Sequence, residues 1–392
     1  ANLAFAAAQE SRTNVLVLDF DQKAGGDQNF ITGMKSKKTM KDIADFPGVI
    51  DPKSLLQFTG EHSQGVSYIG MPTDVISCKN INVDNLGKLL KAVVNIYPVI
   101  IIDAGSELSP MSLKALEFST LIFMVTSQDL LAVNQTVKLY NELISYLFPK
   151  DMMQIILNQY QNGHPVTPDV IQKQLGKAVF AAVPKDEQTC VAALSKNQPV
   201  MVMAKTSNFA KGIVDCVRKV IQKNVLKSLA SLNKPKDAGK ATPGVEKDEK
   251  AAAKQARQAW LDLKSRIHKA LVEEMDLKKS DKNDPKEQII LKEKTRKAVI
   301  DILGKEDTKG ILNSREDMNQ IVKEILDEAL GLGPLEDLLS DRTVSEVMVV
   351  GPYKIFYEKG GKIRLSEIVF TNDSQVRNVI ERIVAPIGRR ID

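Results

Sequence analysis

Three aspartates follow two strongly apolar segments of the sequence. The segment VLVL at 15–18 leads into Asp19 and Asp21, and the segment VIII at 99–102 leads into Asp103. Short apolar runs of this kind predict buried strands of a parallel sheet, which binds ligands at the carboxyl ends of its strands. A carboxylate there can hold Mg²⁺ through water or orient a water toward a γ-phosphate. The alternative is that each aspartate caps a turn or a helix.

A phosphate-binding loop is the partner that such carboxylates need. No G-x-x-x-x-G-K-[ST] segment occurs in the 392 residues. Residues 1–8 (ANLAFAAA) are typical of the helix that follows such a loop, so we expect the sequence to begin just after one. Gly239-Lys240 has part of the pattern, but it follows no predicted strand and lacks the upstream glycine.

Residues 1–228 alternate short apolar segments with amphipathic stretches. This alternation predicts an α/β fold with a doubly wound, mainly parallel sheet. Strands are expected at 15–18, 66–69, 99–102, 121–125, 155–157 and 179–183. Helices are expected at 86–96, 112–117 and 132–147. Residues 229–255 have no apolar period and are rich in Lys, Asp, Gly, Ala, Pro and Glu, which predicts a flexible linker.

The remaining sequence predicts a helical segment at 256–340 and a small α/β domain at 341–392. Apolar residues recur every three or four positions from Trp260 to Met275 and again across 318–330, where Ser314 is a candidate N-cap. A further helix is expected at 289–303. Strands at 345–350, 354–358 and 362–366 and a helix at 376–384 follow, and we expect the sequence to be cut at this end too.

Composition excludes several classes of function. The net charge of +5 is small for 392 residues, so no nucleic-acid partner is expected. Three isolated histidines and three scattered cysteines argue against a His-based catalytic centre and a structural metal, and they favour a reducing compartment. We find no apolar run of transmembrane length and no signal peptide.

Several segments of residues 1–228 together resemble the MinD/ParA family of deviant-Walker ATPases. They are LVLDFD at 16–21 with GGD at 25–27, YPVIIIDAG at 97–105, IILNQ at 155–159, VPKD at 183–186, and NQPV at 197–200 with SNFAK at 207–211. The resemblance implies an ATP- and Mg²⁺-binding domain that forms a homodimer. The absent phosphate loop, and Gln159 where the family has Arg, depart from the pattern.

The resemblance also assigns roles to individual residues. Asp19 belongs to the nucleotide site, Asp21 is the catalytic carboxylate that positions water, and Asp103 holds the water shell of Mg²⁺. Gly105 senses the γ-phosphate through its backbone. The base-contacting residues that the resemblance implies are Asn158, Pro184 and Asp186.

Within that family the segment SPMSLKAL at 109–116 favours the pilus-localisation branch called CpaE or TadZ. Residues 256–392 resemble the amino-terminal region of CpaF/TadA-type secretion ATPases, through GLGPLE at 331–336, TVSEVMVVGP at 343–352 and RIVAPIGRRID at 382–392. That resemblance implies that Arg389 and Arg390 reach nucleotide phosphates; the alternative is that they are surface charges.

These features predict a component of a Flp/type IV pilus or type II-like secretion machine. A localisation domain that dimerises with ATP would be coupled to a secretion motor. Its location would be cytoplasmic, at the inner membrane face or cell pole, with indirect membrane association. The longer protein would hydrolyse ATP, whereas this chain would be incomplete for activity. The alternatives are a DNA-partition ATPase of the ParA type and a non-hydrolysing adaptor. The basic amphipathic stretch at 209–229 is either a membrane-docking helix or the last helix packed on the sheet.

Overall fold

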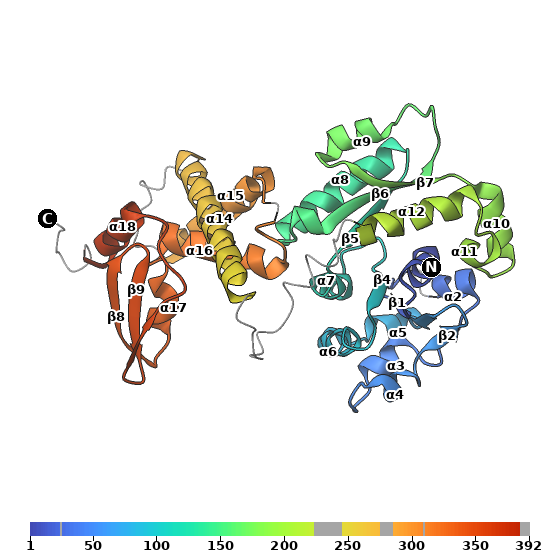
Figure 1. The fold of residues 1–392 in the computed structure, drawn as a ribbon, viewed down its shortest axis with the longest axis horizontal. Helices are drawn as coiled ribbons and strands as arrows, with labels where there is room; N and C mark the ends of the chain where they lie inside the picture. Colours follow the sequence, from blue (N-terminus) through green and yellow to red (C-terminus); the bar gives the residue numbers. More distant parts are fainter. Residues whose placement is uncertain (24–25, 223–244, 275–284, 309, 385–392) are drawn as a thin grey trace. The chain divides into compact units, whose positions relative to one another are not determined.

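The chain forms two compact units in a computed structural model that describes residues 1–23, 26–222, 245–274, 285–308 and 310–384. Unit 1 comprises Ala1–Tyr140 and Met152–Pro235, and unit 2 comprises Asn141–Asp151 and Lys236–Asp392. Unit 1 contains mainly parallel strands flanked by helices, and unit 2 contains helices and a small antiparallel sheet (Figure 1). The predicted fold class is therefore confirmed.

The seven strands that the structure describes in unit 1 form two sheets, with the orders β2-β3-β1-β4 and β5-β6-β7. Every neighbouring pair is parallel except β2 with β3. Their bounds are β1 Val15–Asp19, β2 Gly60–His62, β3 Val66–Ile69, β4 Val99–Asp103, β5 Ile122–Thr126, β6 Met153–Tyr160 and β7 Val179–Pro184. All six expected strands are present. The sequence did not predict β2, because it has only three residues and no apolar run.

Helices surround these sheets and connect the strands. Those of unit 1 are α1 Asn2–Ser11, α2 Asp27–Thr32, α3 Met40–Ala44, α4 Pro52–Leu55, α5 Val75–Lys79, α6 Val83–Val93, α7 Pro110–Glu117, α9 Pro168–Leu175, α10 Glu187–Ser195, α11 Val200–Met203 and α12 Asn208–Gln222. Helix α8, Leu130–Ser145, begins in unit 1 and ends in the segment assigned to unit 2. A 3-10 turn, Lys150–Met152, precedes β6.

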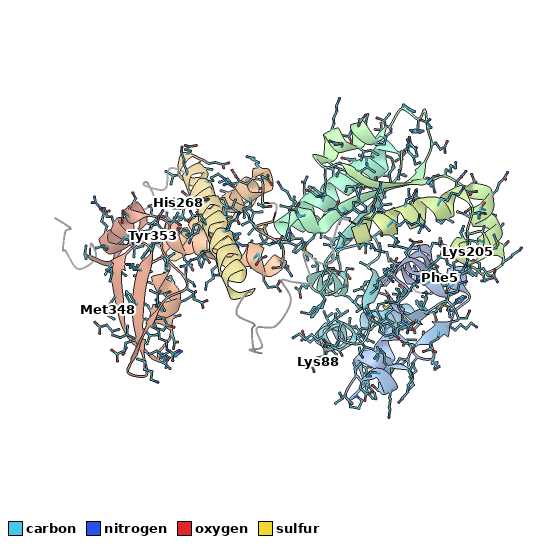
Figure 2. All side chains as sticks on the ribbon, in the orientation of Figure 1. Phe5, Lys88, Lys205, His268, Met348 and Tyr353 are labelled. Atoms are coloured by element: carbon cyan, nitrogen blue, oxygen red, sulfur yellow. The ribbon has the colours of Figure 1, made fainter. Side chains whose placement is uncertain are left out.

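Strand β1 is buried along its whole length because both of its faces are covered. Leu16 and Leu18 pack with residues of α3, α6 and α7, whereas Val15 and Val17 pack with α1, α11 and α12. Phe5 of α1, which is labelled in Figure 2, belongs to the second of these clusters. A strand covered on both faces needs apolar residues at every position, which explains the continuous run in the sequence.

Strands β4 and β5 each lie at the end of their sheet, with one edge that no strand of the described residues pairs with. All five residues of β4 are half-buried although four of them are Val or Ile. On β5 the side chain of Val125 is 60% exposed. Helices α1 and α12 pack on both sheets, since Leu3 and Phe209 belong to the core clusters of each. The two unpaired apolar edges thus lie beneath the same helix layer.

Helix α12 packs on the sheets through its apolar side, with Ala210 and Cys216 buried. The described part of the 209–229 stretch therefore agrees with a last helix of the sheet domain; the positions from 223 onward lie outside the described residues. Among the helices that the structure describes, none has the length and apolar character needed to cross a membrane.

Three helices form the main core of unit 2. They are α14 Val245–Glu274, α15 Pro285–Lys305 and α16 Arg315–Leu330. Leu263, Ile267 and Leu271 of α14 are buried there, as the apolar period predicted, and Ser314 caps α16 in a capping box. The predicted linker was partly wrong, because positions 245–255 belong to α14; positions 229–244 lie outside the described residues.

A second, smaller core joins a three-stranded sheet to two helices. The elements are α17 Leu335–Ser340, β8 Val344–Gly351, β9 Lys354–Lys359, β10 Lys362–Leu365 and α18 Asp373–Val384. Buried Lys264 of α14 forms ion pairs with Glu324 (3.0 Å) and Glu328 (2.8 Å) of α16. Glu328 also accepts a hydrogen bond from Thr371, which precedes α18. The positive charge of Lys264 and these hydrogen bonds compensate the burial of the carboxylate.

Candidate functional site

The ends of β1 and β4 bring two of the predicted aspartates side by side. Asp19 and Asp103 are register partners in the parallel pairing of these strands. The backbone N–H of Phe20 donates to the carbonyl of Asp103 (2.7 Å), which extends the pairing past the last strand residue. Two carboxylates therefore lie at the carboxyl edge of the first sheet, where ligands of parallel sheets bind.

Asp19 is almost fully buried, with 1% of its surface exposed. Burial raises the pKa of this carboxyl to about 6, and the nearby negative charge of Asp103 adds to the rise. Hydrogen bonds from the backbone N–H of Asp21 (3.1 Å) and the hydroxyl of Tyr68 (3.3 Å) oppose it. Asp19 thus holds the start of the loop that contains Asp21 in place. A cation beside Asp19 would favour its charged form.

Asp21 lies directly against the loop that follows β4. Gly105 has φ +71°, and a Cβ added there would lie 2.9 Å from the Cγ of Asp21. Only glycine adopts this conformation without strain and permits this approach. An ion pair between Lys23 and Glu107 connects the same two loops. The sequence predicted Asp21 and Gly105 for one site, and the structure brings them together.

Gln28 is a site residue that the sequence did not reveal. Its Nε2 donates to Oδ2 of Asp103 (2.6 Å) from helix α2, while the backbone N–H of Gly105 donates to Oδ1 (3.3 Å). The Oε1 of Gln28 is buried and accepts no hydrogen bond from the part of the chain that is described. A neutral amide inside a short helix carries no motif, so only the contact identifies it.

This arrangement fits a hydrated cation better than a direct ligand cage. No group of three or more His, Cys, Asp or Glu side chains is arranged to hold a metal within the described ranges. Mg²⁺ usually keeps several waters and takes one or two carboxylates. Asp103 could hold such a water shell, and Oε1 of Gln28 is a buried acceptor beside it that a water could satisfy.

The amino end of α1 lies at the same place. Its N-cap residue, Ala1, lies close enough to Asp103 and Asp19 for their charges to act on it. A helix amino end carries partial positive charge and unpaired N–H groups, which favour an anion. The edge therefore combines carboxylates for a cation with a helix end suited to phosphate.

The residues predicted to contact the base lie at the carboxyl edge of the second sheet. Asn158 is near the end of β6, and Pro184 ends β7 opposite Tyr160. Asp186 accepts a hydrogen bond from the backbone N–H of Thr189 (3.3 Å) and so caps α10. This cap is a structural role for Asp186 that the sequence pattern did not separate from base contact. Arg389 and Arg390 lie outside the described residues, as does Gly239-Lys240.

Comparison with known proteins finds similar solved structures and one short sequence match. No family model matches the sequence. A ParA family ATPase from Chlorobium tepidum TLS has a similar structure, with a TM-score of 0.53 and 25% identity, covering 55% of this chain and 90% of that chain. MinD from Pyrococcus horikoshii OT3, solved with Mg-ADP, gives 0.49 and 18%, covering 58% of this chain and 90% of that one.

A short sequence match points to a different class of protein. Two Mycobacterium tuberculosis proteins that are named as conjugal transfer proteins are 37% identical to this chain over 65 residues. The match covers 17% of this chain and spans 18% of the length of each relative. The likeness to the Chlorobium ATPase covers more than half of the chain, and about half of this protein therefore has the fold of the MinD/ParA-type ATPases.

Proposed function

We propose that unit 1 is a nucleotide-dependent switch that dimerises with ATP and Mg²⁺, and that unit 2 couples it to a pilus-assembly or type II-like secretion motor. The contact of Gly105 with Asp21 beside the Asp19–Asp103 pair is the observation that carries the proposal. The short match to conjugal transfer proteins supports a machine that moves macromolecules. The finer placement in the CpaE/TadZ branch, with a CpaF/TadA-type second half, rests on the sequence segments quoted above.

In this proposal each residue of the edge has a separate task. Asp103, which accepts a hydrogen bond from Gln28, holds the water shell of Mg²⁺. Asp21 orients the attacking water. Gly105 senses the γ-phosphate through its backbone, at a position where a side chain would collide with Asp21. Asn158, Pro184 and Asp186 line the base. ATP with Mg²⁺ supplies the phosphoanhydride bond that is cleaved.

The site also needs positive charge for the triphosphate, which the described residues supply only in part. We propose that a further parallel strand with a phosphate-binding loop pairs with the free edges of β4 and β5. Three observations support it: neither edge is paired by a strand of the described residues, β4 is half-buried despite its apolar sequence, and Val125 is exposed.

Exposed apolar residues support dimerisation through this same edge. Phe30 of α2, Leu131 of α8 and Val191 of α10 are each more than half exposed, and their helices follow β1, β5 and β7. Large exposed apolar side chains are characteristic of interaction surfaces. The likeness to a ParA family ATPase also favours a second candidate, a DNA-partition ATPase, which leaves unit 2 without a role.

One experiment separates these functions. Sedimentation of the full product of the gene with Mg-ATP should show a nucleotide-dependent dimer. This dimer should not retain duplex DNA, and it should co-purify with the secretion motor. The 392-residue chain should bind Mg-ATP weakly in titration calorimetry, since phosphate-loop donors are missing from its sequence. DNA retention by the dimer would favour the partition ATPase, and absence of nucleotide binding in the full product would leave only the adaptor.

A further inference from the structure

The small sheet of unit 2 has one face that is packed and one that is not. Residues directly opposite each other on antiparallel strands share a face, so the register assigns each side chain. Ile355 is buried against Phe370 and Val379, which identifies the inner face. We call the opposite side the outer face, and it consists of Glu346, Met348, Lys354, Phe356, Glu358, Ile363 and Leu365.

Apolar side chains form a row across the middle of the outer face. Met348, Phe356 and Leu365 are register partners on the three adjacent strands β8, β9 and β10. Leu365 is 57% exposed and its neighbour Ile363 is 65% exposed, while Met348 and Phe356 are half-buried. Met348 is labelled on β8 in Figure 2. A contiguous apolar patch on a folded surface marks an interaction site.

Charges of opposite sign lie on either side of this row. Glu346 and Glu358 are register partners on one side, and like charges in this position repel. Lys354 lies two residues from Phe356 in the other direction, so it is on the same face. None of these three side chains forms an ion pair with any part of the chain that is described. The outer face therefore has Glu346 and Glu358 beside Ile363 at one end, an apolar row in the middle and Lys354 at the other end.

This pattern is complementary to itself. A second copy can be placed over the outer face by a two-fold axis that runs along the row of Met348, Phe356 and Leu365. The strands of this copy then run in the opposite direction, and its outer face meets the outer face of the first copy. The axis stacks each apolar residue on its own copy and places Lys354 of each copy over Glu358 of the other. Face-to-face sheets pack about 10 Å apart with nearly aligned strands, which suits this arrangement. An interface of this isologous kind repeats every contact twice.

We propose that the outer face is an interface between two copies of this chain, related by this two-fold axis. It is separate from the nucleotide-dependent dimer proposed for unit 1 and needs no nucleotide. The three-stranded sheet is small, so the association is weak and depends on protein concentration. The Lys354 ammonium of the second copy then lies over the acidic pair. Its positive charge offsets the repulsion between Glu346 and Glu358.

Sedimentation equilibrium of the 392-residue chain without nucleotide, over a wide range of concentration, tests the proposal. Lys354→Glu and Glu358→Lys should each weaken self-association roughly tenfold, which is about 1.4 kcal/mol, because each change occurs twice across the axis. An equal mixture of the two single variants should associate about as well as the unchanged chain, since both contacts are then between opposite charges. Leu365→Lys should abolish association.

The controls distinguish this surface from the others. Val191→Lys changes a comparably exposed residue of unit 1 and should leave association unchanged. A cooperative melt followed by Trp260, the single tryptophan, verifies that unit 2 of each variant is folded. A chain that stays monomeric at every concentration overturns the proposal. So does a mixture of the two charge variants that associates no better than either alone, or loss of association in the Val191 variant only.

Discussion

Replacing Gly105 with alanine should destabilise unit 1, and the structure separates two causes. The backbone at Gly105 has φ +71°, a left-handed conformation that costs a residue with a Cβ about 1–2 kcal/mol. The added Cβ would also lie 2.9 Å from Cγ of Asp21, and such overpacking typically costs about 1–3 kcal/mol. Together these terms predict a loss of about 3 kcal/mol in the free energy of unfolding.

Two further variants separate the contributions of backbone strain and overpacking to this loss of stability. Gly176 follows α9 with φ +64° and has no atom within 4 Å of an added Cβ, so Gly176→Ala should cost only the backbone strain of about 1 kcal/mol. Combining Gly105→Ala with Asp21→Ala removes the closest contact but leaves the Cβ of residue 21 at 3.3 Å. A double-mutant cycle should therefore recover roughly 1 kcal/mol or more as coupling energy.

The assay must report unit 1 alone, since Trp260 lies in unit 2 and a fluorescence melt would follow the wrong unit. Cys216 is fully buried in unit 1, and burial raises the pKa of its thiol to about 11, so it reacts with a maleimide only after opening. Labelling of its peptide across a urea gradient, read by mass spectrometry, gives the free energy of unfolding. Equal losses for Gly105→Ala and Gly176→Ala, or a cycle without coupling, would refute the contact between the two loops.

Three further outcomes are expected. The carboxyl of Asp19 has a pKa near 6 in the folded chain, above its unfolded value of about 3.9, so the stability of unit 1 falls as pH rises between these values. In the same labelling assay, Asp19→Asn should therefore stabilise unit 1 at pH 7 by up to about 3 kcal/mol. A variant with the same pH profile of stability as the unchanged chain would contradict this. In the full product of the gene, Asp21→Ala should slow ATP hydrolysis at least about tenfold with little change in binding, whereas Asp103→Ala should weaken Mg²⁺-dependent binding; a normal rate for the Asp21 variant in a phosphate-release assay would remove its catalytic role. Limited trypsin digestion should cut first within 231–244, where lysines lie in a sequence without apolar period, and the carboxyl-terminal product should keep a cooperative melt followed by Trp260; loss of that melt would mean that the two sides share a core.

Local sequence was sufficient for most elements of both units. The runs at 15–18 and 99–102 have no polar residue, which only a strand covered on both faces explains, and β1 is indeed buried throughout. The period of three or four in α14 and the capping box at Ser314 are likewise local signals. Local sequence did not predict β2, because this short strand depends on pairing with β3. It also did not predict the start of α14, because the first residues of this helix have a polar composition typical of a linker.

The sequence by itself determined that acidic residues follow two apolar strands, and from this the carboxylates of the site could be named. Only the tertiary structure decided which neighbours they have. Gln28 reaches Asp103 across 75 positions of sequence, and Gly105 meets Asp21 because β1 and β4 pair in parallel. The order of strands in a sheet is set by the packing of whole faces rather than by local periodicity. The unpaired edges of β4 and β5, and the outer face of the small sheet, follow from that packing alone.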